Sequence, residues 1–455
     1  MSVPGVAAPA PLRQHLGETL SLAAPVMVAR AGVLVMVVVD TVMTGLAASD
    51  ELAFYAIATA PFTLLMLLGI GLMTGVVVLV AQAAGAGRSA ECGAIWRMGV
   101  LDGLILGGLG ALLLLPAEGM LRALGQSEAL AVHGGEVTRM FAIGLPAVLM
   151  HTATAFFLEG IRRPHVNIAV MVLANLVNAL LNYGLIYGEL GLPAMGGAGA
   201  ALATSIARWF MFLALLVYAW RMQGAEGFGV RGGSGGGLAL QRRLLALGLP
   251  VAAAQGLETA AFQMLTIFGG WLGTTQLAAY QALNNLIALV YMLTLGLSTA
   301  TAVRVGGAVG RNAPIDARRA AWIGVAAGAG IMLLLGPVLL LFRETIAQGY
   351  TNDPHVLLLM APAMALLAPV IIVDCTQGVL AGALRGGSDV WIPTTLYVTG
   401  FWVVQVPVAW LCAFRLDLGV PGLLLGILAG CTVASLLLGT RLHLVARSGR
   451  LVAAG

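Results

Sequence analysis

Long apolar runs separated by short polar segments occupy almost the whole chain of 455 residues. A helix needs about 20 apolar residues to cross a hydrocarbon core about 30 Å thick, and twelve runs reach that length. A backbone in lipid must satisfy its own N–H and C=O groups, so runs this long and uniformly apolar predict helices and not barrel strands. The predicted spans are residues 18–44, 52–82, 94–115, 134–158, 165–187, 197–221, 244–272, 278–308, 319–342, 355–382, 390–413 and 421–446.

Composition agrees with an integral membrane protein that has no separate soluble domain. Apolar residues make up 60% of the chain and charged residues 9%, whereas a soluble domain carries roughly 25% charged residues. The net charge of +4 is small for this length, and we attribute the arginines to the base composition of the genome and not to nucleic-acid binding. Arg13, His15 and Glu18 precede an apolar run that is itself the first span, so we expect no cleaved signal peptide.

The arginines predict which ends of the spans face the cytoplasm, because cytoplasmic flanks hold the positive excess. All 23 basic residues are arginine, and with a cytoplasmic N-terminus only Arg122, Arg343 and Arg415 fall in outside loops. We therefore expect both termini in the cytoplasm. The inside segments collect fifteen arginines at positions 13, 88, 162, 163, 221, 231, 242, 243, 311, 318, 319, 385, 441, 447 and 450.

The second half of the chain repeats the first. At a constant offset of 225 residues, several Pro, Tyr, Gly and Thr positions coincide. Matches among Gly residues arise easily in so biased a sequence, but Pro, Tyr and Thr matches at one ungapped offset do not. Because six spans return to the starting side, two parallel six-helix repeats follow, an arrangement found in transporters. We expect lobes at 1–221 and 242–455, joined by a flexible Gly-rich cytoplasmic linker at 222–241. Matching pairs include Pro25 with Pro250, Tyr55 with Tyr280, Gly71 with Gly296, and Thr74 with Thr299.

Small residues predict close packing within the first lobe. Gly99, Gly103 and Gly107 recur every four residues in the third span, so they lie on one helix face and permit near contact of two backbones. We interpret this ladder as helix packing.

Three carboxylates lie well inside predicted spans. Asp40 is in the first span, Glu258 in the seventh and Asp374 in the tenth. A charged side chain at mid-membrane depth costs about 2.5 kcal/mol or more, so it normally faces a cavity or a partner. Each of the three acids is a candidate for binding a cation or a proton, and the alternative is a structural hydrogen-bonding acid inside its lobe. His151, midway along the fourth span, is expected to be neutral and hydrogen-bonded.

Polar residues on neighbouring spans are candidate partners of these acids. Asn178 and Asn182 are one helical turn apart, so both amides lie on one face of the fifth span, where they could bond Asp40 or simply hold helices together. Gln281 and Asn284 form a similar polar face near the eighth span, together with Tyr280 and Asn285. This face could help Glu258 and Asp374 to hold an ion, and helix packing is again the alternative.

These motifs together resemble the multidrug and toxic compound extrusion (MATE) family, in particular its NorM-like bacterial branch. The resemblance covers nearly the whole chain. It rests on Pro25, Asp40-Thr41-Val42-Met43-x-Gly45, Ala81-Gln82-x-x-Gly85-Ala86-Gly87, Asn178-x-x-x-Asn182-Tyr183, Tyr187-Gly188, Pro193 and Gly199-Ala200-Ala201-Leu202-Ala203-Thr204.

The resemblance implies roles for the buried acids. Glu258 and Asp374 lie where the NorM-like branch carries the cation-binding acids of its second lobe, so they are the expected ligands of Na⁺ or carriers of H⁺. Asp40, Asn178 and Asn182 lie where the family has its first-lobe acid and amide partners. One departure concerns the tyrosine that some members place one turn before the acid of the tenth span, where this chain has Val370.

The resemblance further implies a monomeric antiporter in the lipid bilayer, which exports cationic or amphipathic organic compounds and drugs in exchange for inward Na⁺ or H⁺. No cofactor is expected beyond the coupling ion. The alternative within transport is a lipid-linked saccharide flippase of the same broader fold, for which a cationic central cavity is expected. A membrane-embedded enzyme is the competing class, but the sequence has no HExxH, Walker or clustered Cys/His signature.

Overall fold

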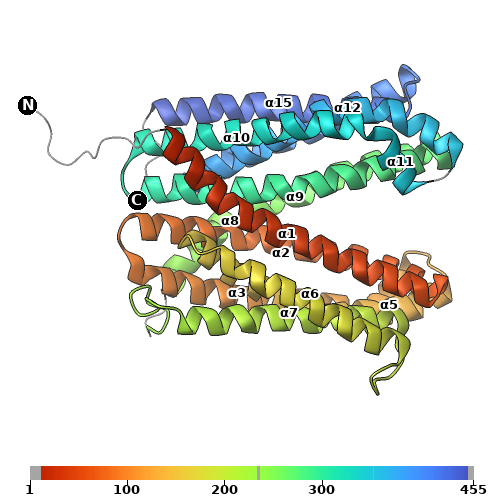
Figure 1. Cartoon of the computed structure of the whole chain (residues 1–455), viewed down its shortest axis with the longest axis horizontal. Helices are drawn as coiled ribbons and strands as arrows, with labels where there is room; N and C mark the ends of the chain where they lie inside the picture. The colour runs from red at the N-terminus through yellow and green to blue at the C-terminus, as the bar shows by residue number, and fades with distance from the viewer. Residues whose placement is uncertain (1–11, 233–235, 352, 449–455) are drawn as a thin grey trace, which may run out of the picture. The chain divides into compact units, whose positions relative to one another are not determined.

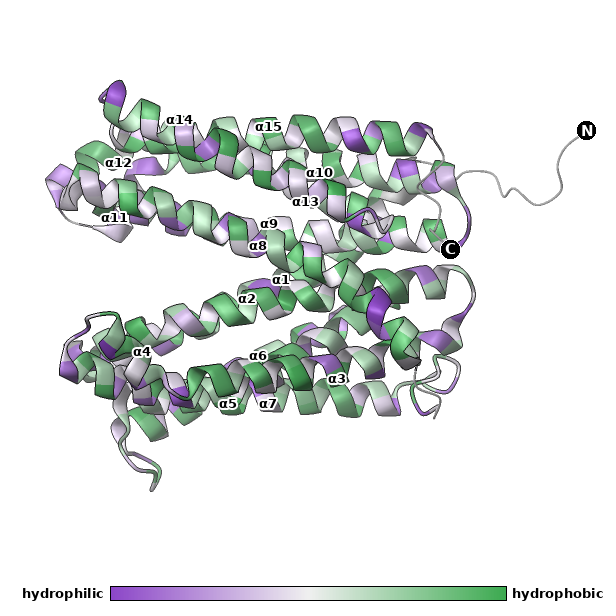
Figure 2. Cartoon of the chain, turned by 180° about the vertical axis from the view of Figure 1, so that it is seen from behind, coloured by the Kyte–Doolittle hydropathy of each residue, from purple (hydrophilic) through white to green (hydrophobic). Residues whose placement is uncertain are grey.

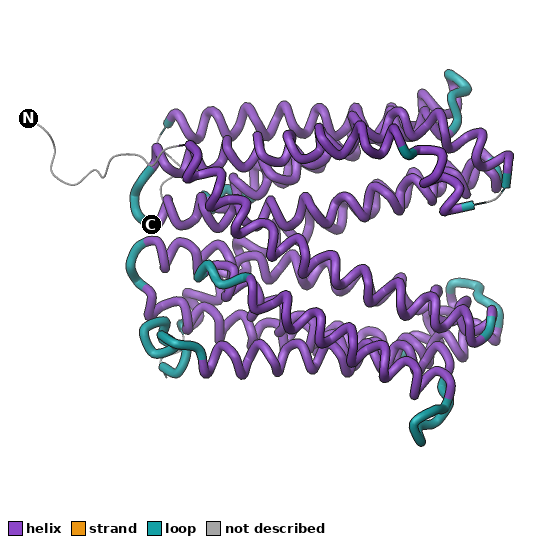
Figure 3. The backbone as a smooth tube through the Cα atoms, viewed as in Figure 1, coloured by secondary structure: helices purple, strands orange, loops and turns teal. Residues whose placement is uncertain are grey.

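The computed structural model describes residues 12–232, 236–351 and 353–448, and this part of the chain contains helices and loops without any strand (Figure 3). Twelve of its helices are long and apolar enough to cross a membrane, which confirms the twelve predicted spans. Hydrophilic residues gather mainly near the helix ends (Figure 2), as expected where chains leave a bilayer. The spanning helices are α1 (Leu12–Ala47), α2 (Ser49–Gly85), α3 (Ser89–Leu114), α5 (Glu128–Gly160), α6 (His165–Tyr187), α7 (Gly196–Arg221), α8 (Gly237–Leu272), α9 (Thr274–Gly310), α10 (Pro314–Leu341), α12 (Pro354–Gly386), the eleventh span at Trp391–Arg415, and α15 (Val420–Arg447).

Three elements were absent from the prediction. Short helices α4 (Ala117–Ala123) and α11 (Arg343–Tyr350) lie between spans. The eleventh span is irregular: α13 (Trp391–Val398) and α14 (Val406–Trp410) alternate with π-helical segments at Thr399–Gln405 and Leu411–Arg415. Pro407 lies inside this span, and proline removes a helical donor and clashes with the preceding turn, which is a usual cause of such irregularity.

The chain forms two compact units (Figure 1). The N-unit contains residues 28–84 and 88–255, and the C-unit contains residues up to 27, 85–87 and those from 256 onward. The first part of α1 therefore belongs to the C-unit, and the first part of α8 belongs to the N-unit. The predicted lobes divided the chain between helices, at 221 and 242, and did not include this exchange.

The exchange is reciprocal and follows the sequence repeat. In the N-unit, a Cβ on Gly71 would lie 2.6 Å from Cα of Ala252, and in the C-unit a Cβ on Gly296 would lie 2.8 Å from the backbone nitrogen of Met27. Gly296 follows Gly71, and Ala252 follows Met27, by the same 225 residues. Real Cβ atoms do not approach backbone this closely, so glycine is what permits each exchanged segment to pack.

The Gly-rich segment predicted as a flexible linker is folded where the structure describes it. Residues 222–232 form turns against α3, where the N–H of Gly93 donates to the carbonyl of Phe228 at 2.7 Å and Nη1 of Arg97 donates to the carbonyl of Gly229 at 2.6 Å. Gly229 has a φ of +65°, which a side chain would disfavour. From Gly237 onward the segment belongs to α8. The composition favours flexibility, but backbone hydrogen bonds to α3 override it.

An aromatic cluster in the N-unit supports the residues that surround Asp40. Phe62 stacks on Phe141 with ring centroids 4.9 Å apart, and Tyr55 lies 5.4 Å from the same ring. All three are almost fully buried in one apolar cluster. The cluster leaves little freedom to Tyr55, whose hydroxyl group points at the candidate site described below.

The glycine ladder of α3 allows a direct test of close packing. A Cβ on Gly107 would lie 2.4 Å from Cα of Pro146 on α5, whereas a Cβ on its neighbour Gly108 would meet nothing within 4 Å. We expect Gly107→Ala to destabilise the protein by about 1–3 kcal/mol through overpacking. Gly108→Ala, the matched control, should be neutral or should gain up to about 1 kcal/mol from helix propensity.

The measurement is the thermal unfolding midpoint of both purified variants in the same detergent. An equal effect of the two substitutions would mean that close approach of α3 and α5 does not limit stability.

Candidate functional site

The first candidate site surrounds Asp40, which lies in α1 with 1% of its side chain exposed. Its Oδ1 accepts hydrogen bonds from Nδ2 of Asn182 at 2.7 Å and from Nδ2 of Asn178 at 3.0 Å. Its Oδ2 accepts from the hydroxyl groups of Tyr55, at 3.1 Å, and of Thr204. The expected hydrogen bonds to both amides are therefore present, and the carboxylate collects four donors from α2, α6 and α7.

Tyr55 and Thr204 were not predicted to be members of this site. The sequence contained a hint of the importance of each residue, because Tyr55 recurs as Tyr280 in the repeat and Thr204 ends the motif that begins at Gly199. One helical turn after Thr204, Arg208 lies with its guanidinium 4.4 Å from the centre of the Phe62 ring, and its charge acts on Asp40. A half-buried cation therefore accompanies the four neutral donors.

This arrangement is complete only while Asp40 is ionised. A carboxylate accepts several hydrogen bonds, but a protonated carboxyl becomes a donor and loses part of its accepting capacity. The Oδ1 of Asn182 is buried and has no hydrogen-bond partner among the described residues. It is therefore a candidate acceptor for the proton of a neutral Asp40. Protonation of Asp40 would thus rearrange the bonds that connect α1 with α6 and α7.

The second candidate site lies in the C-unit and brings together Glu258 of α8 and Asp374 of α12. The two carboxylates act on each other electrostatically. Oε1 of Glu258 accepts a hydrogen bond from the hydroxyl group of Tyr397 at 3.3 Å. Oδ1 of Asp374 accepts from Nε2 of Gln377 at 3.0 Å, and Sγ of Cys431 lies 3.9 Å from the same oxygen. Asp374 is buried and Glu258 is half-buried, and two like charges this sheltered from water favour a cation or a proton between them.

Further oxygen atoms surround this pair of acids. Oε1 of Gln377 is buried and has no partner among the described residues. The phenols of Tyr397 and Tyr291 interact with each other and with Glu258. Tyr280 was predicted to lie near the acids, whereas Tyr397 and Tyr291 were not. Val370, at the position where some relatives have a tyrosine, is fully buried. Tyr397 comes from α13, a different helix, and its proximity to Glu258 could not be seen from spacing along the chain.

These groups fit a hard cation by the type of donor atom. Carboxylate, amide and phenol oxygens are the ligands that hard cations prefer. Among the described residues, no group of three or more His, Cys, Asp or Glu side chains is placed to hold a metal ion.

In the described part of the chain, no hydrogen bond connects the polar face predicted on the eighth span with Glu258 or Asp374. Gln281 and Asn285 are exposed and Asn284 is half-buried. Asn285 accepts a hydrogen bond from Tyr350 of α11 at 2.9 Å, and partial burial raises the pKa of the Tyr350 phenol, which keeps it a neutral donor. The hydrogen bonds found at Glu258 and Asp374 in the described part of the chain come from other residues.

Two other buried polar groups lie in the N-unit. His151 forms a hydrogen bond through Nε2 with Oδ1 of Asn167 at 3.1 Å, in line with the expected hydrogen-bonded histidine. Glu159 of α5 is 3% exposed, its Oε2 has no hydrogen-bond partner among the described residues, and the charge of Arg30 acts on it. The sequence did not single out Glu159, because the predicted span ended at residue 158.

Comparison with known proteins agrees with this architecture. A sequence model of the MatE family matches residues 25–184 and 250–411. The two matched segments begin at Pro25 and Pro250, the same offset of 225 residues that the repeat has.

Relatives match over nearly their full length. The chain is 35% identical over 426 residues to the "Probable multidrug resistance protein NorM" of Caulobacter vibrioides, covering 93% of this chain and 90% of that protein. It is 32% identical over 458 residues to the "Multidrug resistance protein PmpM" of Pseudomonas aeruginosa, covering 96% and 93%. A solved structure described as the outward-facing conformation of a multidrug resistance MATE family transporter superposes with a TM-score of 0.87 at 20% identity, over 97% of this chain and 99% of that one. This last similarity shows the fold.

Proposed function

Because this chain belongs to the MatE family, we propose that it is a secondary active multidrug exporter that moves cationic or amphipathic organic compounds outward in exchange for inward Na⁺ or H⁺. Two relatives that match over at least nine tenths of their length carry multidrug resistance in their names. The observation that supports coupling most directly is the Glu258 and Asp374 pair, whose electrostatic repulsion is relieved when a cation or a proton binds.

Exchange follows if coupling ion and cargo cannot occupy the protein together. A cation or proton on Glu258 and Asp374 removes negative charge that a cationic drug requires, so one must leave before the other binds. The membrane potential supplies about 2.3 kcal/mol per charge per 100 mV, enough for roughly 50-fold accumulation per net charge moved. Asp40 provides a second switch, because its protonation changes the hydrogen bonds between α1, α6 and α7. Together these steps describe alternating access.

Na⁺ is our preferred coupling ion. Its support is the likeness to the NorM-like branch and the set of hard oxygens around Glu258, Asp374, Gln377 and Tyr397. Each unit gathers its polar groups around carboxylates, and the hydrogen-bond donors to these carboxylates are neutral groups, although the charge of Arg208 acts on Asp40 and that of Arg385 on Glu258. Because carboxylates are the centre of both sites, we favour a cationic cargo over the phosphate-linked saccharide of a flippase. We further propose that the protein acts as a monomer in the bacterial inner membrane with both termini cytoplasmic, as the fifteen arginines on that side indicate.

The proposed function predicts dye movement that depends on an ion gradient. Purified protein in liposomes should transport a cationic fluorescent dye when an inward Na⁺ gradient or an inward pH gradient is imposed separately, and should be inactive without either. A protease added outside spheroplasts should spare a C-terminal tag, which checks the orientation. Equal dye transport with and without an imposed gradient would contradict coupled export. Transport driven only by the pH gradient would exclude Na⁺ as the coupling ion.

A further inference from the structure

A pocket of about 310 Å³ lies inside the N-unit, at the junction of the end of α2, the start of α3 and the start of α8. Its walls include the apolar side chains of Leu79, Ile95 and Leu240. Arg88 and Arg243 supply charge at its edge, together with Glu91. The pocket is remote in sequence from Asp40 and its partners, and the coupling mechanism above does not use it.

The charges of this pocket do not cancel. Nη1 of Arg88 and Oε2 of Glu91 form an ion pair at 3.0 Å. Arg243 is exposed, and the ion pairs found in the described part of the chain do not include it. One positive charge therefore remains beside an apolar wall. A cavity of this size lies at the lower end of the range for small-molecule sites.

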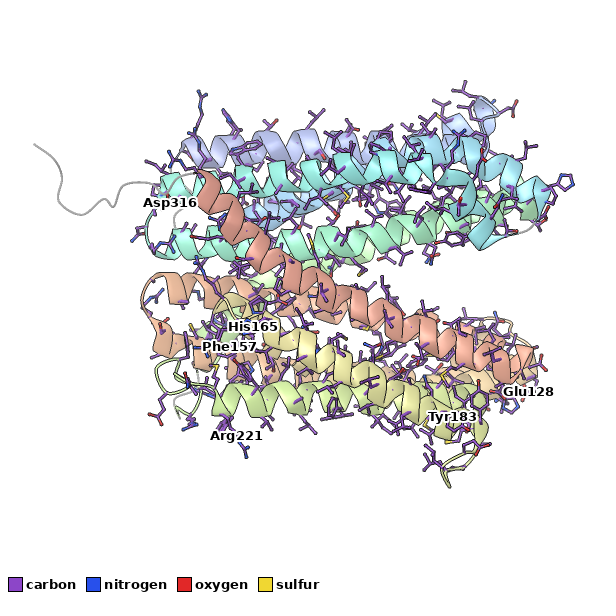
Figure 4. The ribbon with its side chains drawn as sticks, in the orientation of Figure 1. Glu128, Phe157, His165, Tyr183, Arg221 and Asp316 are labelled. Atoms are coloured by element: carbon purple, nitrogen blue, oxygen red, sulfur yellow. The ribbon has the colours of Figure 1, made fainter. Side chains whose placement is uncertain are left out.

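The pocket lies at the arginine-rich end of the N-unit. In Figure 4, Phe157, His165 and Arg221 mark one end of this unit, and Glu128 and Tyr183 mark the other. A Cβ on Gly160 would lie 2.6 Å from Val80, so the end of α2 belongs to the end that Phe157 marks. This end carries arginines 88, 162, 163, 221, 231, 242 and 243, whereas the opposite end carries Arg122 and Arg139, which pair with Glu118.

We propose that this pocket binds the phosphate of an amphipathic anion, and that the anion is an acidic phospholipid such as phosphatidylglycerol from the adjacent leaflet. The helices at the pocket begin or end at the membrane surface, where lipid phosphates lie. Basic pockets between spanning helices are suited to acidic headgroups. Leu79, Ile95 and Leu240 match the glycerol and upper acyl region, which free phosphate lacks.

Charge selects among lipids in this arrangement. Arg243 attracts the phosphate, and Arg88 remains close enough to Glu91 to share its charge between the carboxylate and the ligand. A zwitterionic lipid would also bring an ammonium group. The carboxylate that lines the pocket is Glu91, and it is already paired with Arg88. An acidic lipid brings no such group and therefore fits better.

The test is native mass spectrometry of the full-length protein released from detergent with phosphatidylglycerol, phosphatidylcholine or inorganic phosphate. We expect Arg243→Gln to lower the apparent affinity for phosphatidylglycerol about fivefold, the effect of one interfacial arginine. Arg242→Gln is the matched control, because Arg242 is an exposed neighbour on the same helix and does not line the pocket. It should leave retention of the lipid unchanged. Ala239→Phe, which adds bulk to the wall without changing charge, should also weaken binding.

The outcomes separate the sources of the phosphate. Preference for phosphatidylglycerol over phosphatidylcholine, lost in Arg243→Gln but not in Arg242→Gln, supports the proposal. Equal retention of the two lipids, or equal effects of the two arginine substitutions, overturns it. Displacement of phosphatidylglycerol by inorganic phosphate at equal concentration would assign the pocket to a free anion and would also overturn it. Unchanged melting temperatures of the variants confirm that they are folded, and none of these measurements requires transport activity.

Discussion

Glu258→Gln and Asp374→Asn should each reduce ion-driven dye export to the level seen without a gradient. Each substitution removes one of the two carboxylates that act on each other in the C-unit. A neutral amide keeps the shape and an oxygen, but it neither takes up a proton nor attracts a cation as a carboxylate does. The double variant should be little worse than either single variant, because the site is already lost after one change and effects within one site are not additive.

The measurement is dye export from liposomes under separate Na⁺ and pH gradients, with each variant reconstituted at equal density. Glu344→Gln is the matched control, since Glu344 is an exposed carboxylate of α11 in the same unit. The Glu344→Gln variant should export dye at the same ion-driven rate as the wild-type protein. If both site variants keep full coupling to the ion that drives the wild-type protein, the second candidate site is not the coupling site.

Asp40→Asn should impair export severely while expression and membrane insertion remain intact. The amide cannot titrate, but it can keep most of the hydrogen bonds of the site. Asn178 and Asn182 can still donate to its oxygen, and the hydroxyl groups of Tyr55 and Thr204 can turn to accept from its nitrogen. The fold is therefore preserved while the switch is lost.

Asp40→Leu provides the contrast that separates a structural from a functional role. Leucine removes the acceptor of four hydrogen bonds. Nδ2 of Asn178 and of Asn182 keep their bonds to Thr204 and Asn178, but the hydroxyl groups of Tyr55 and Thr204 lose the acceptor that Asp40 gave them. Each buried unsatisfied group costs about 1–3 kcal/mol, so this variant should unfold at a clearly lower temperature. The Asn variant should melt within a few degrees of the wild-type protein. Wild-type export by Asp40→Asn would assign Asp40 to structure alone, and the measurement pairs thermal unfolding with liposome export.

The sequence by itself determined the class of the protein, its twelve spans and its internal repeat. These features depend on local composition, because a helix needs about 20 apolar residues to cross a bilayer and a charged side chain inside the bilayer costs free energy. The depth of Asp40, Glu258 and Asp374 was visible for the same reason. So was the pairing of Asn178 with Asn182, because a separation of four residues places both on one helix face.

Only the tertiary structure decided which residues meet. Tyr397 and Glu258 are 139 residues apart, and Thr204 and Asp40 are 164 apart, and no periodicity along one helix reports on the rotation of another. The reciprocal exchange of the first parts of α1 and α8 was equally hidden, because the offset of 225 shows which segments are equivalent but not which helix each packs against. Gly71 and Gly296 permit these contacts because they lack a Cβ atom. The need for glycine at these positions can be recognised only when the position of the opposing backbone is known.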